Sequence, residues 1–201
     1  SLQDQVALVT GAAGGIGSAI VKQFLTQGAK IVMSGTNPEK LESFAASLNA
    51  PDRVAFIVCN LADANETNAL FAAAEEKFGP IDILVNNAGK NKDKLFMMMK
   101  DEDFEEIINI NLTSTFRLCK AALKSMSKRG QGRIINITSI VGFTGNMGQA
   151  NYTAAKAGIV GLSKTLALEY ATKGITVNCI APGFIETPMT SAIPEAAQAK
   201  I

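Results

Sequence analysis

Residues 6–17 read VALVTGAAGGIG, an apolar run that leads directly into a glycine-rich turn. The run Val6–Thr10 shows no alternation of polar and apolar residues, which is typical of a strand buried on both faces of a sheet. Gly11, Gly15 and Gly17 follow with the spacing G-x-x-x-G-x-G, and a helical pattern begins at Ile16. A strand, a glycine turn and a helix in this order predict the first unit of a parallel α/β sheet.

The glycine turn also predicts a binding site for the pyrophosphate of a dinucleotide. Its first glycine permits a tight turn, its second lets a phosphate approach the backbone, and its third lets the helix pack close to the sheet. The free N–H groups at the start of the helix then bind the phosphate oxygens. We therefore expect the cofactor to contact Gly11, Ala13, Gly15, Ile16 and Gly17.

Short apolar runs continue to alternate with longer helical segments along the chain. This alternation implies right-handed crossovers, and so predicts one Rossmann-like domain over residues 1–201: a doubly wound parallel sheet with helices on both faces, in three α/β/α layers. Glycines stand just past four of the expected helix ends, where a left-handed cap favours them: Gly28, Gly79, Gly130 and Gly174. The expected strands are 6–10, 30–34, 54–59, 81–85, 133–138 and 176–180, and the expected helices are 16–27, 38–48, 65–78, 101–128 and 151–173.

Ligands of such sheets bind beyond the carboxyl ends of the strands. An NAD enzyme usually carries an acid at the end of its second strand, where it holds the ribose 2′-hydroxyl. Here that position reads Ser34-Gly35-Thr36-Asn37, which has no acid to repel a 2′-phosphate. No arginine lies nearby, and Lys40 is the nearest cation after the strand. We expect NADPH, with NADH as the weaker alternative, and a contact from Thr36.

Composition excludes several classes of protein and of site. The chain has 201 residues, 47% of them apolar, a formal net charge of +1 and no histidine, so His-ligated metals and His-based triads are excluded. Cys59, Cys119 and Cys179 lack the spacing of a zinc site or a disulfide framework, and we expect free thiols, no metal and a cytoplasmic location. We see no signal peptide, no apolar run long enough to span a membrane, and no charge excess that would attract nucleic acid.

Tyr152 and Lys156 are four residues apart on one expected helix, so they share a face. A tyrosine has a pKa near 10, and a neighbouring ammonium lowers the pKa by favouring the tyrosinate. Ser139 directly follows the fifth expected strand and reaches the same edge of the sheet. This pattern predicts a proton-transfer site in which Tyr152 is the acid, Lys156 tunes it, and Ser139 donates to a developing oxyanion.

With these residues in place, the sequence resembles the short-chain dehydrogenase/reductase family over essentially its whole length. The resemblance rests on TGAAGGIG at 10–17, NNAG at 86–89, Asn111, Ser139, YTAAK at 152–156 and the run from Pro182 to Thr187. More narrowly, the runs at 99–104, 148–158 and 174–189 resemble bacterial 3-oxoacyl-[acyl-carrier-protein] reductases of that family.

The resemblance implies NADPH-dependent reduction of 3-oxoacyl-[acyl-carrier-protein] to the 3-hydroxyacyl product in fatty acid biosynthesis. It makes Lys156 a ligand of the nicotinamide ribose and Asn111 the anchor of a water that links Lys156 to solvent. It implies a homodimer or homotetramer, and a further C-terminal strand and tail that we expect residues 1–201 to lack. The remaining cofactor contacts that it implies are Asn60, Leu61, Asn87, Ala88, Gly89, Tyr152, Pro182, Gly183, Ile185 and Thr187.

Two other functions stay open at this point. One is a reductase or dehydrogenase of the same fold that acts on another carbonyl or alcohol, such as an acyl-CoA, a sugar or a steroid. The other is a nucleotide-binding regulator without turnover, against which the set Ser139, Tyr152 and Lys156 argues.

The sequence alone leaves the roles of three further features undecided. Lys128, Arg129 and Lys173 are candidates for docking an acidic acyl carrier protein near the cleft, or equally for complementing helix dipoles. The run from Leu95 to Met99 either borders an acyl entrance or belongs to the core or a subunit interface. Lys90, directly after NNAG, has no account from the sequence.

Overall fold

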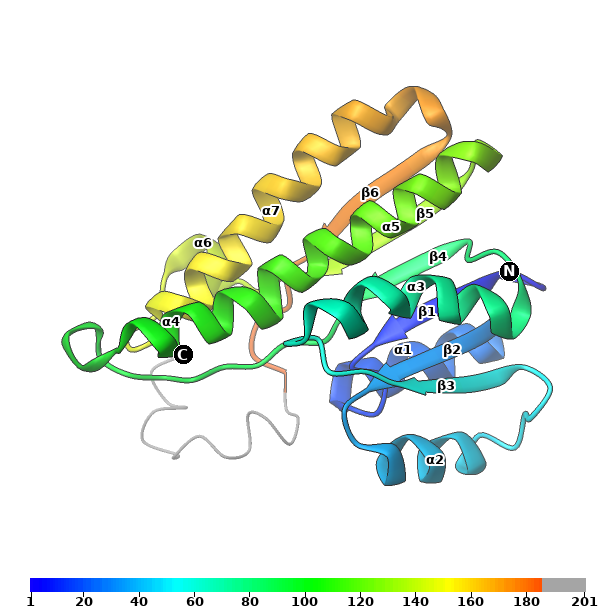
Figure 1. Cartoon of the computed structure of the whole chain (residues 1–201), viewed down its shortest axis with the longest axis horizontal. Coiled ribbons are helices and arrows are strands. Elements are labelled where there is room, and N and C mark those ends of the chain that lie inside the picture. The colour runs from blue at the N-terminus through cyan, green and yellow to red at the C-terminus, as the bar shows by residue number, and fades with distance from the viewer. Residues whose placement is uncertain (186–201) are drawn as a thin grey trace.

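The computed structural model describes residues 1–185 (Figure 1). Within that part of the chain all strands lie parallel in one sheet, in the order β3-β2-β1-β4-β5-β6. The strand order reverses between β1 and β4, so the sheet is doubly wound and the predicted fold class is confirmed. The strands are β1 (Val6–Thr10), β2 (Lys30–Gly35), β3 (Val54–Val58), β4 (Ile83–Asn86), β5 (Gly132–Ile137) and β6 (Ile175–Ile180).

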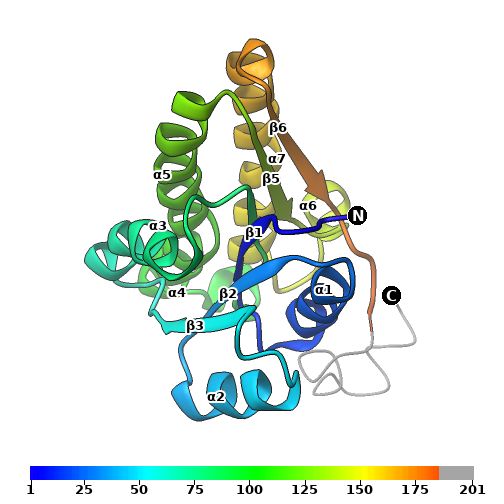
Figure 2. The same cartoon turned by 90° about the vertical axis from the view of Figure 1, so that its right-hand side faces the viewer.

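Helices cover both faces of the sheet. Figure 2 shows α1 on one side of the strands, and α3 and α5 on the other. Asn37 caps α2 and Asp63 caps α3 by accepting hydrogen bonds from backbone N–H groups of the first turn. The helices are α1 (Gly15–Thr26), α2 (Pro38–Ser47), α3 (Ala64–Phe78), α4 (Asp101–Ile108), α5 (Ser114–Arg129), α6 (Val141–Thr144) and α7 (Ala150–Tyr170), with 3₁₀ turns η1 (Phe96–Met98) and η3 (Ala171–Lys173).

The central strand β1 contributes side chains to the hydrophobic core on both faces of the sheet. All five of its residues are buried. Val6 and Leu8 pack into the layer that α3, α5 and α7 form, while Ala7 and Val9 pack into the layer of α1 and α2. Because successive side chains of a strand point to opposite faces, the apolar residues at positions 6–9 supply both cores. Full burial of a Val or Leu side chain stabilises the fold by about 1.5–3 kcal/mol relative to exposure.

The expected helix 101–128 is interrupted, which corrects the prediction. A π-helical turn, η2 (Asn109–Thr113), separates α4 from α5, and the N–H of Ser114 reaches back five residues to the carbonyl of Asn109. A π-turn fits one extra residue into the helix and rotates the residues around it. Asn111 lies within this turn and is fully buried.

The loops agree with the turn signals of the sequence. Gly28, Gly79, Gly130 and Gly174 all have positive φ, between 67° and 95°, as expected of residues that end helices. The short helix α6 was not expected, because four residues are too few to show a helical period. None of the described helices is long and apolar enough to cross a membrane.

Candidate active site

The glycine turn and the NNAG segment meet at the carboxyl ends of β1 and β4. The side-chain Nδ2 of Asn87 donates to the carbonyls of Thr10 at 3.0 Å and Gly11 at 3.2 Å. The hydroxyl of Thr10 accepts from the backbone N–H groups of Asn87 at 3.1 Å and Ala88 at 3.0 Å. These four bonds lock the two predicted cofactor-binding segments together at the switch point of the sheet.

The turn itself forms a cradle that a side chain would fill. A Cβ placed on Gly17 would lie 2.1 Å from the carbonyl oxygen of Gly11, and one on Gly11, which has a φ of 61°, would lie 2.8 Å from the Cα of Ala88. Helix α1 begins at Gly15, and no side chain among the described residues caps it at Gly14. The backbone N–H groups of its first turn therefore meet what the pyrophosphate of a dinucleotide requires.

Ser139, Tyr152 and Lys156 come together beside this cradle. Ser139 lies two residues after β5, and its hydroxyl is close enough to the phenol of Tyr152, on the first turn of α7, to lower the pKa of that phenol. The Nζ of Lys156, one turn further along α7, lies 5.4 Å from the centroid of the Tyr152 ring. The structure thus brings the three predicted catalytic side chains into one group.

Burial dominates the protonation of this group. Lys156 is 3% exposed, and burial lowers its pKa from 10.5 to about 8. Its Nζ donates to the carbonyl of Ile137 at 2.9 Å. Burial, together with the carboxylate of Asp93, raises the pKa of Tyr152, while the hydrogen bond with Ser139 acts in the opposite direction. The expectation of a depressed tyrosine pKa is therefore wrong for the protein without ligands, because loss of hydration raises the pKa of Tyr152.

Asn111 closes the back of the site. Its Nδ2 donates to the carbonyls of Lys90 at 2.8 Å and Ile107 at 2.9 Å, and its Oδ1 accepts from the N–H of Lys90 at 3.2 Å. A Cβ on Gly89 would lie 2.7 Å from the Oδ1 of Asn111 and 3.5 Å from the Nζ of Lys156. Asn111 therefore lies at the Lys156 end of the site, and its role as a water anchor stays a prediction.

The other predicted cofactor contacts line the same edge of the sheet but differ in what they offer. Thr36 is exposed after β2, whereas the side chain of Leu61 is buried in the core, so only its backbone could face a ligand. The Oδ1 of Asn60 accepts from the N–H of Ala62 at 3.0 Å. The carbonyl of Pro182 accepts from the N–H of Ile140 at 3.0 Å, which ties the end of β6 to the loop after β5. Gly183 and Ile185 follow it, and Thr187 lies outside the described residues.

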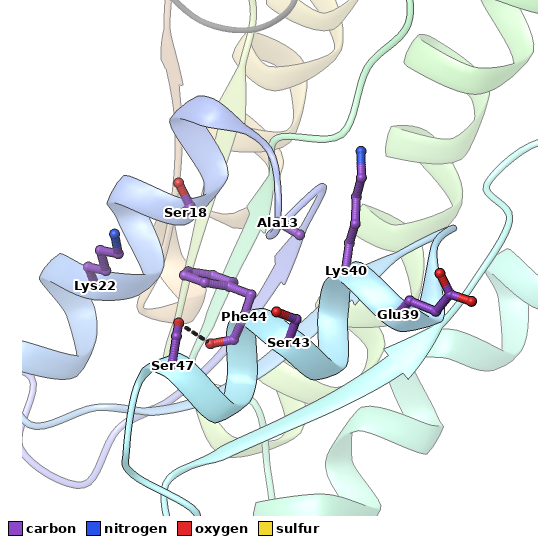
Figure 3. Close-up of a pocket in the computed structure, with 8 residues that line it drawn as sticks. All are labelled: Ala13, Ser18, Lys22, Glu39, Lys40, Ser43, Phe44 and Ser47. Atoms are coloured by element: carbon purple, nitrogen blue, oxygen red, sulfur yellow. Dashed lines mark hydrogen bonds between the residues drawn. The ribbon is translucent and has the colours of Figure 1, made fainter.

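An open cavity of about 510 Å³ lies between α1 and α2, next to the glycine turn (Figure 3). Ala13 contributes the wall that belongs to the turn, while Lys22 of α1 and Lys40 of α2 lie at opposite ends of the lining. The Nζ of Lys22 lies 5.9 Å from the centroid of the Phe44 ring. The remaining lining residues are Ser18, Glu39, Ser43 and Ser47. The cavity is thus open, bordered by two cations and one carboxylate, and continuous with the predicted cofactor site.

Three polar residues that hold the segments of the site together were missed by the sequence reasoning. Thr10 joins the two cofactor segments, and the hydroxyl of Thr138 donates to the carbonyl of Lys156 at 2.7 Å. Asn151, directly before Tyr152, is fully buried and uses its whole side-chain amide in hydrogen bonds. Their positions, at the ends of strands and directly before the tyrosine, were the signal in the sequence that could have identified them.

The lysines proposed for docking lie at the wrong edge of the sheet. Lys128 and Arg129 end α5, and Lys173 lies in η3, each directly before the strand that follows. A helix that precedes a parallel strand ends at that strand's amino edge, opposite the edge that holds Tyr152. The Nη1 of Arg129 also pairs with Asp82 at 2.8 Å. A docking patch near the cleft of the same chain is therefore not formed by these residues.

The segment after NNAG begins with an ion-paired lysine and ends with exposed apolar residues. Lys90 pairs with Glu106 of α4 at 2.5 Å, which accounts for a cation at that position. Leu95, Phe96, Met97 and Met98 are between 59% and 89% exposed, so they do not belong to the core of this chain. Their exposure fits either an acyl entrance or a subunit interface.

The cysteines of the described chain are free thiols, as expected. Cys59 and Cys119 are buried free thiols, and burial raises their pKa values to about 11 and about 12. Among residues 1–185 no group of three Cys, Asp or Glu side chains is arranged to hold a metal ion.

Comparisons with known proteins agree with this geometry. The sequence profile of the short chain dehydrogenase family matches residues 5–198. The chain is 52% identical over 192 residues to Nodulation protein G of Rhizobium sp. (strain N33), covering 96% of this chain and 78% of that protein. It is 50% identical over 192 residues to the 3-oxoacyl-[acyl-carrier-protein] reductase FabG of Rickettsia bellii, covering 96% and 77%. It is 46% identical over 201 residues to the enzyme of that name from Escherichia coli, covering 100% and 82%.

A solved structure supports the same relationship. A crystal structure of a variant actinorhodin polyketide ketoreductase with NADPH superposes with a TM-score of 0.92 at 38% identity, covering 97% of this chain and 76% of that one. The glycine cradle and the grouped Ser139, Tyr152 and Lys156 occur at the edge of the sheet where the sequence predicted them. The chain therefore belongs to the short-chain dehydrogenase family, whose members are oxidoreductases that bind a nicotinamide cofactor.

Proposed function

We propose that this chain catalyses the NADPH-dependent reduction of a 3-oxoacyl group on acyl carrier protein to the 3-hydroxyacyl product. The observation that carries the proposal is the group of Ser139, Tyr152 and Lys156 beside the glycine cradle. This group offers a hydrogen-bond donor and a proton at one point, as carbonyl reduction requires. The resemblance to reductases of that name supports the choice of substrate.

A reduced nicotinamide cofactor, when bound, supplies the hydride that adds to the 3-oxo carbon. Ser139 donates a hydrogen bond to the carbonyl oxygen, where negative charge grows as the carbon–oxygen double bond becomes a single bond. Tyr152 gives that oxygen its phenolic proton, which completes the hydroxyl and leaves a tyrosinate. Lys156, whose Nζ lies 5.4 Å from the centroid of the Tyr152 ring, then stabilises the tyrosinate and would also hold the ribose hydroxyls of the cofactor.

The raised pKa of Tyr152 suits this direction of reaction. A proton donor must be protonated at the working pH, and burial keeps the phenol neutral well above neutrality. Lys156, whose pKa is about 8, carries its charge through most of the neutral range. The site is thus set for proton donation before the substrate arrives.

The cavity between α1 and α2 supports NADPH over NADH. No acid follows Ser34 and Gly35 at the end of β2, and Lys22 and Lys40 border the cavity next to Ala13 of the glycine turn (Figure 3). Two ammonium groups attract the 2′-phosphate that distinguishes NADPH. The carboxylate of Glu39 at the same rim opposes them, so the preference is one of degree.

Exposed apolar residues support both the acyl substrate and self-association. Leu95 to Met98 form an exposed apolar segment a few residues after NNAG, where an acyl chain could lie. Phe104 of α4 and Phe116 of α5 are 38% and 48% exposed, which supports pairing of these helices between copies in a homodimer or homotetramer. Size-exclusion chromatography with light scattering tests the assembly.

The decisive experiment compares steady-state oxidation of NADPH and NADH with acetoacetyl groups on acyl carrier protein and on coenzyme A. We expect the highest kcat/KM with NADPH and the carrier-bound substrate. Faster turnover of the coenzyme A thioester, or of a sugar or steroid ketone in the same assay, would assign the site to another carbonyl substrate. Cofactor binding without turnover of any carbonyl would indicate a nucleotide-binding regulator instead.

A further inference from the structure

Asn151 lies directly before Tyr152 and is 0% exposed, yet no step of the proposed reaction uses it. Its Oδ1 accepts a hydrogen bond from the backbone N–H of Tyr152 at 2.8 Å. Its Nδ2 donates to the carbonyl of Lys92 at 3.0 Å and to the carbonyl of Asp103 at 3.1 Å. One side chain therefore connects the first turn of α7 to two segments that are remote in the sequence.

Only one orientation of this amide satisfies its surroundings. With Oδ1 toward the N–H of Tyr152, both hydrogens of Nδ2 point at carbonyl oxygens. Rotation of the amide by half a turn would place a donor against the donor of Tyr152 and an acceptor against two acceptors. The N–H of Tyr152 is among the first four of α7, which have no partner within the helix, so Asn151 supplies the acceptor that it needs.

Lys92 and Asp103, the two carbonyl partners, are themselves anchored. Lys92 belongs to the segment 90–95, which we call the strap. Its Nζ pairs with the carboxylates of Asp103 at 2.8 Å and Glu106 at 2.7 Å on α4. Lys94 pairs with Asp103 at 2.5 Å, and its N–H donates to the carbonyl of Gly148 at 2.8 Å. Hydrogen bonds from Lys92 and Lys94 hold the pKa of Asp103 well below its usual range, so these ion pairs persist over the working pH range.

The strap also reaches the opposite end of the catalytic group. The backbone of Lys90 exchanges two hydrogen bonds with the side chain of Asn111. The strap is therefore held to Asn111 at its start and to Asn151 two residues later. Asn111 and Tyr152 lie on different helices, and this short segment bridges them.

We propose that Asn151 is a positioning residue for the reduction, fixing the first turn of α7, and with it the phenol of Tyr152, against the strap and α4. The inference rests on the proposed function for its effect on rate, but its structural part is measurable without substrate. Tyr152 must meet Ser139 and the substrate oxygen together, and a displacement of about 1 Å can cost on the order of 100-fold in rate.

The variant Asn151→Leu tests this directly, because leucine has nearly the same shape and makes none of the three hydrogen bonds. The matched control is Asn136→Leu, since Asn136 is also 0% exposed and binds Ser163 and Asn86 in the core, away from Tyr152. We expect Asn151→Leu to lower kcat by roughly 10- to 100-fold, with the Kd of NADPH and the KM of the thioester changed by less than about threefold. Asn136→Leu should lower Tm and leave kcat per folded molecule close to that of the parent.

A spectroscopic titration provides a readout that does not depend on turnover. The chain has two tyrosines and no tryptophan, so a Tyr170→Phe background leaves Tyr152 as its single phenol. Ser139, Lys156 and the carboxylate of Asp93 are the polar and charged groups that face this phenol. In Asn151→Leu we expect its ultraviolet titration to shift toward that of an exposed tyrosine, near about pH 10, while in Asn136→Leu it stays in place.

If Asn151→Leu does not fold, Asn151→Asp replaces it, since the aspartate keeps an acceptor for the N–H of Tyr152 but loses both donations. The proposal is overturned if the Asn151 variant and Asn136→Leu lose activity in the same proportion as folded protein, with the phenol titration unchanged. A parent protein that binds NADPH but reduces no 3-oxoacyl thioester would instead reject the proposed function, and the titration would still decide the position of Tyr152.

Discussion

The Nζ of Lys156 lies 5.4 Å from the ring centroid of Tyr152. Burial shifts the pKa of each side chain in the direction that favours its neutral form. The lysine is lowered to about 8 and the tyrosine is raised. The pair is therefore arranged as a protonated acid beside a cation that is readily discharged. Such a pair favours proton donation to a growing alkoxide over proton removal from an alcohol at neutral pH.

The variant Tyr152→Phe removes the proposed acid and leaves the ring. We expect kcat to fall by about 10²–10⁴-fold, the usual contribution of a positioned general acid, with the Kd of NADPH nearly unchanged. Stopped-flow NADPH oxidation and fluorescence titration measure the two quantities. Wild-type turnover in this variant would show that another group protonates the substrate.

The variant Ser139→Ala removes a donor to the carbonyl oxygen. We expect a loss of about 10²–10³-fold in kcat, corresponding to about 2.7–4 kcal/mol of transition-state stabilisation. Because the hydroxyl of Ser139 lowers the pKa of Tyr152, the pKa of the tyrosine should rise further in this variant. The pH profile of kcat records that shift, and a profile identical to the parent's would place Ser139 outside the proton path.

The variant Lys156→Met should inactivate the enzyme and yet stabilise the fold at neutral pH. The pKa of Lys156 falls from 10.5 in the unfolded chain to about 8 in the folded one, so the unfolded chain binds the proton more tightly. This cost of folding is fully present below pH 8 and is relieved as pH rises toward 10.5. We expect a gain of about 1–3 kcal/mol at pH 7, measured by urea unfolding.

The same measurement between pH 7 and pH 10 provides the control for that prediction. The stability difference between Lys156→Met and the parent should narrow as pH rises from 8 toward 10.5, because in this range the lysine of the parent is already neutral in the folded chain and still protonated in the unfolded chain. A difference that stays constant with pH would mean that packing, and not the buried charge, sets the cost.

The variant Lys40→Gln should weaken binding of NADPH by about tenfold, since a hydrogen bond to a charged group contributes about 1.5–3 kcal/mol. NADH, which lacks the 2′-phosphate, should bind as before. Lys77→Gln on α3, at the opposite face of the sheet, is the matched control. Glu39→Gln should strengthen NADPH binding, and equal effects on both cofactors would remove the cavity from the specificity argument.

Two glycine-to-alanine substitutions compare a position that has no room for a side chain with one that has room. A Cβ on Gly17 would lie 2.1 Å from a backbone oxygen, whereas one on Gly161, exposed on α7, meets nothing within 4 Å. We expect Gly17→Ala to destabilise the fold by more than about 2 kcal/mol and to abolish NADPH binding. Gly161→Ala should stabilise it by about 0.5–1 kcal/mol, because alanine is the better helix former. Thermal unfolding of both variants makes the comparison.

The sequence was sufficient for the order of elements and for the edge at which the site forms. Strand β1 is bounded as expected, Val6–Thr10, because buried parallel strands are uniformly apolar and end at a glycine turn. Ser139, Tyr152 and Lys156 met as predicted, since strand ends and a four-residue helical spacing are local properties of the chain. These parts depend on neighbours within a few residues.

The sequence was insufficient where several segments meet. The π-turn at Asn111 has no periodic signal of its own, and the three hydrogen bonds of Asn151 join segments that only the folded chain brings together. The direction of the pKa shift of Tyr152 was predicted wrongly, because it depends on how much water the fold removes from around the phenol. Arg129 was placed at the wrong edge because the direction of its helix relative to the sheet was not considered.

The reversal of strand order beside β1 also bears on biosynthesis. Ala7 of β1 pairs with Ile31 of β2 on one side and with Ile83 of β4 on the other. A ribosome delivers Ile31 early and Ile83 much later, so the nascent chain presents an unpaired and largely apolar strand edge for most of the time between them. Such an edge recruits other chains, and holdase chaperones should therefore engage this protein chiefly before residues 83–86 emerge.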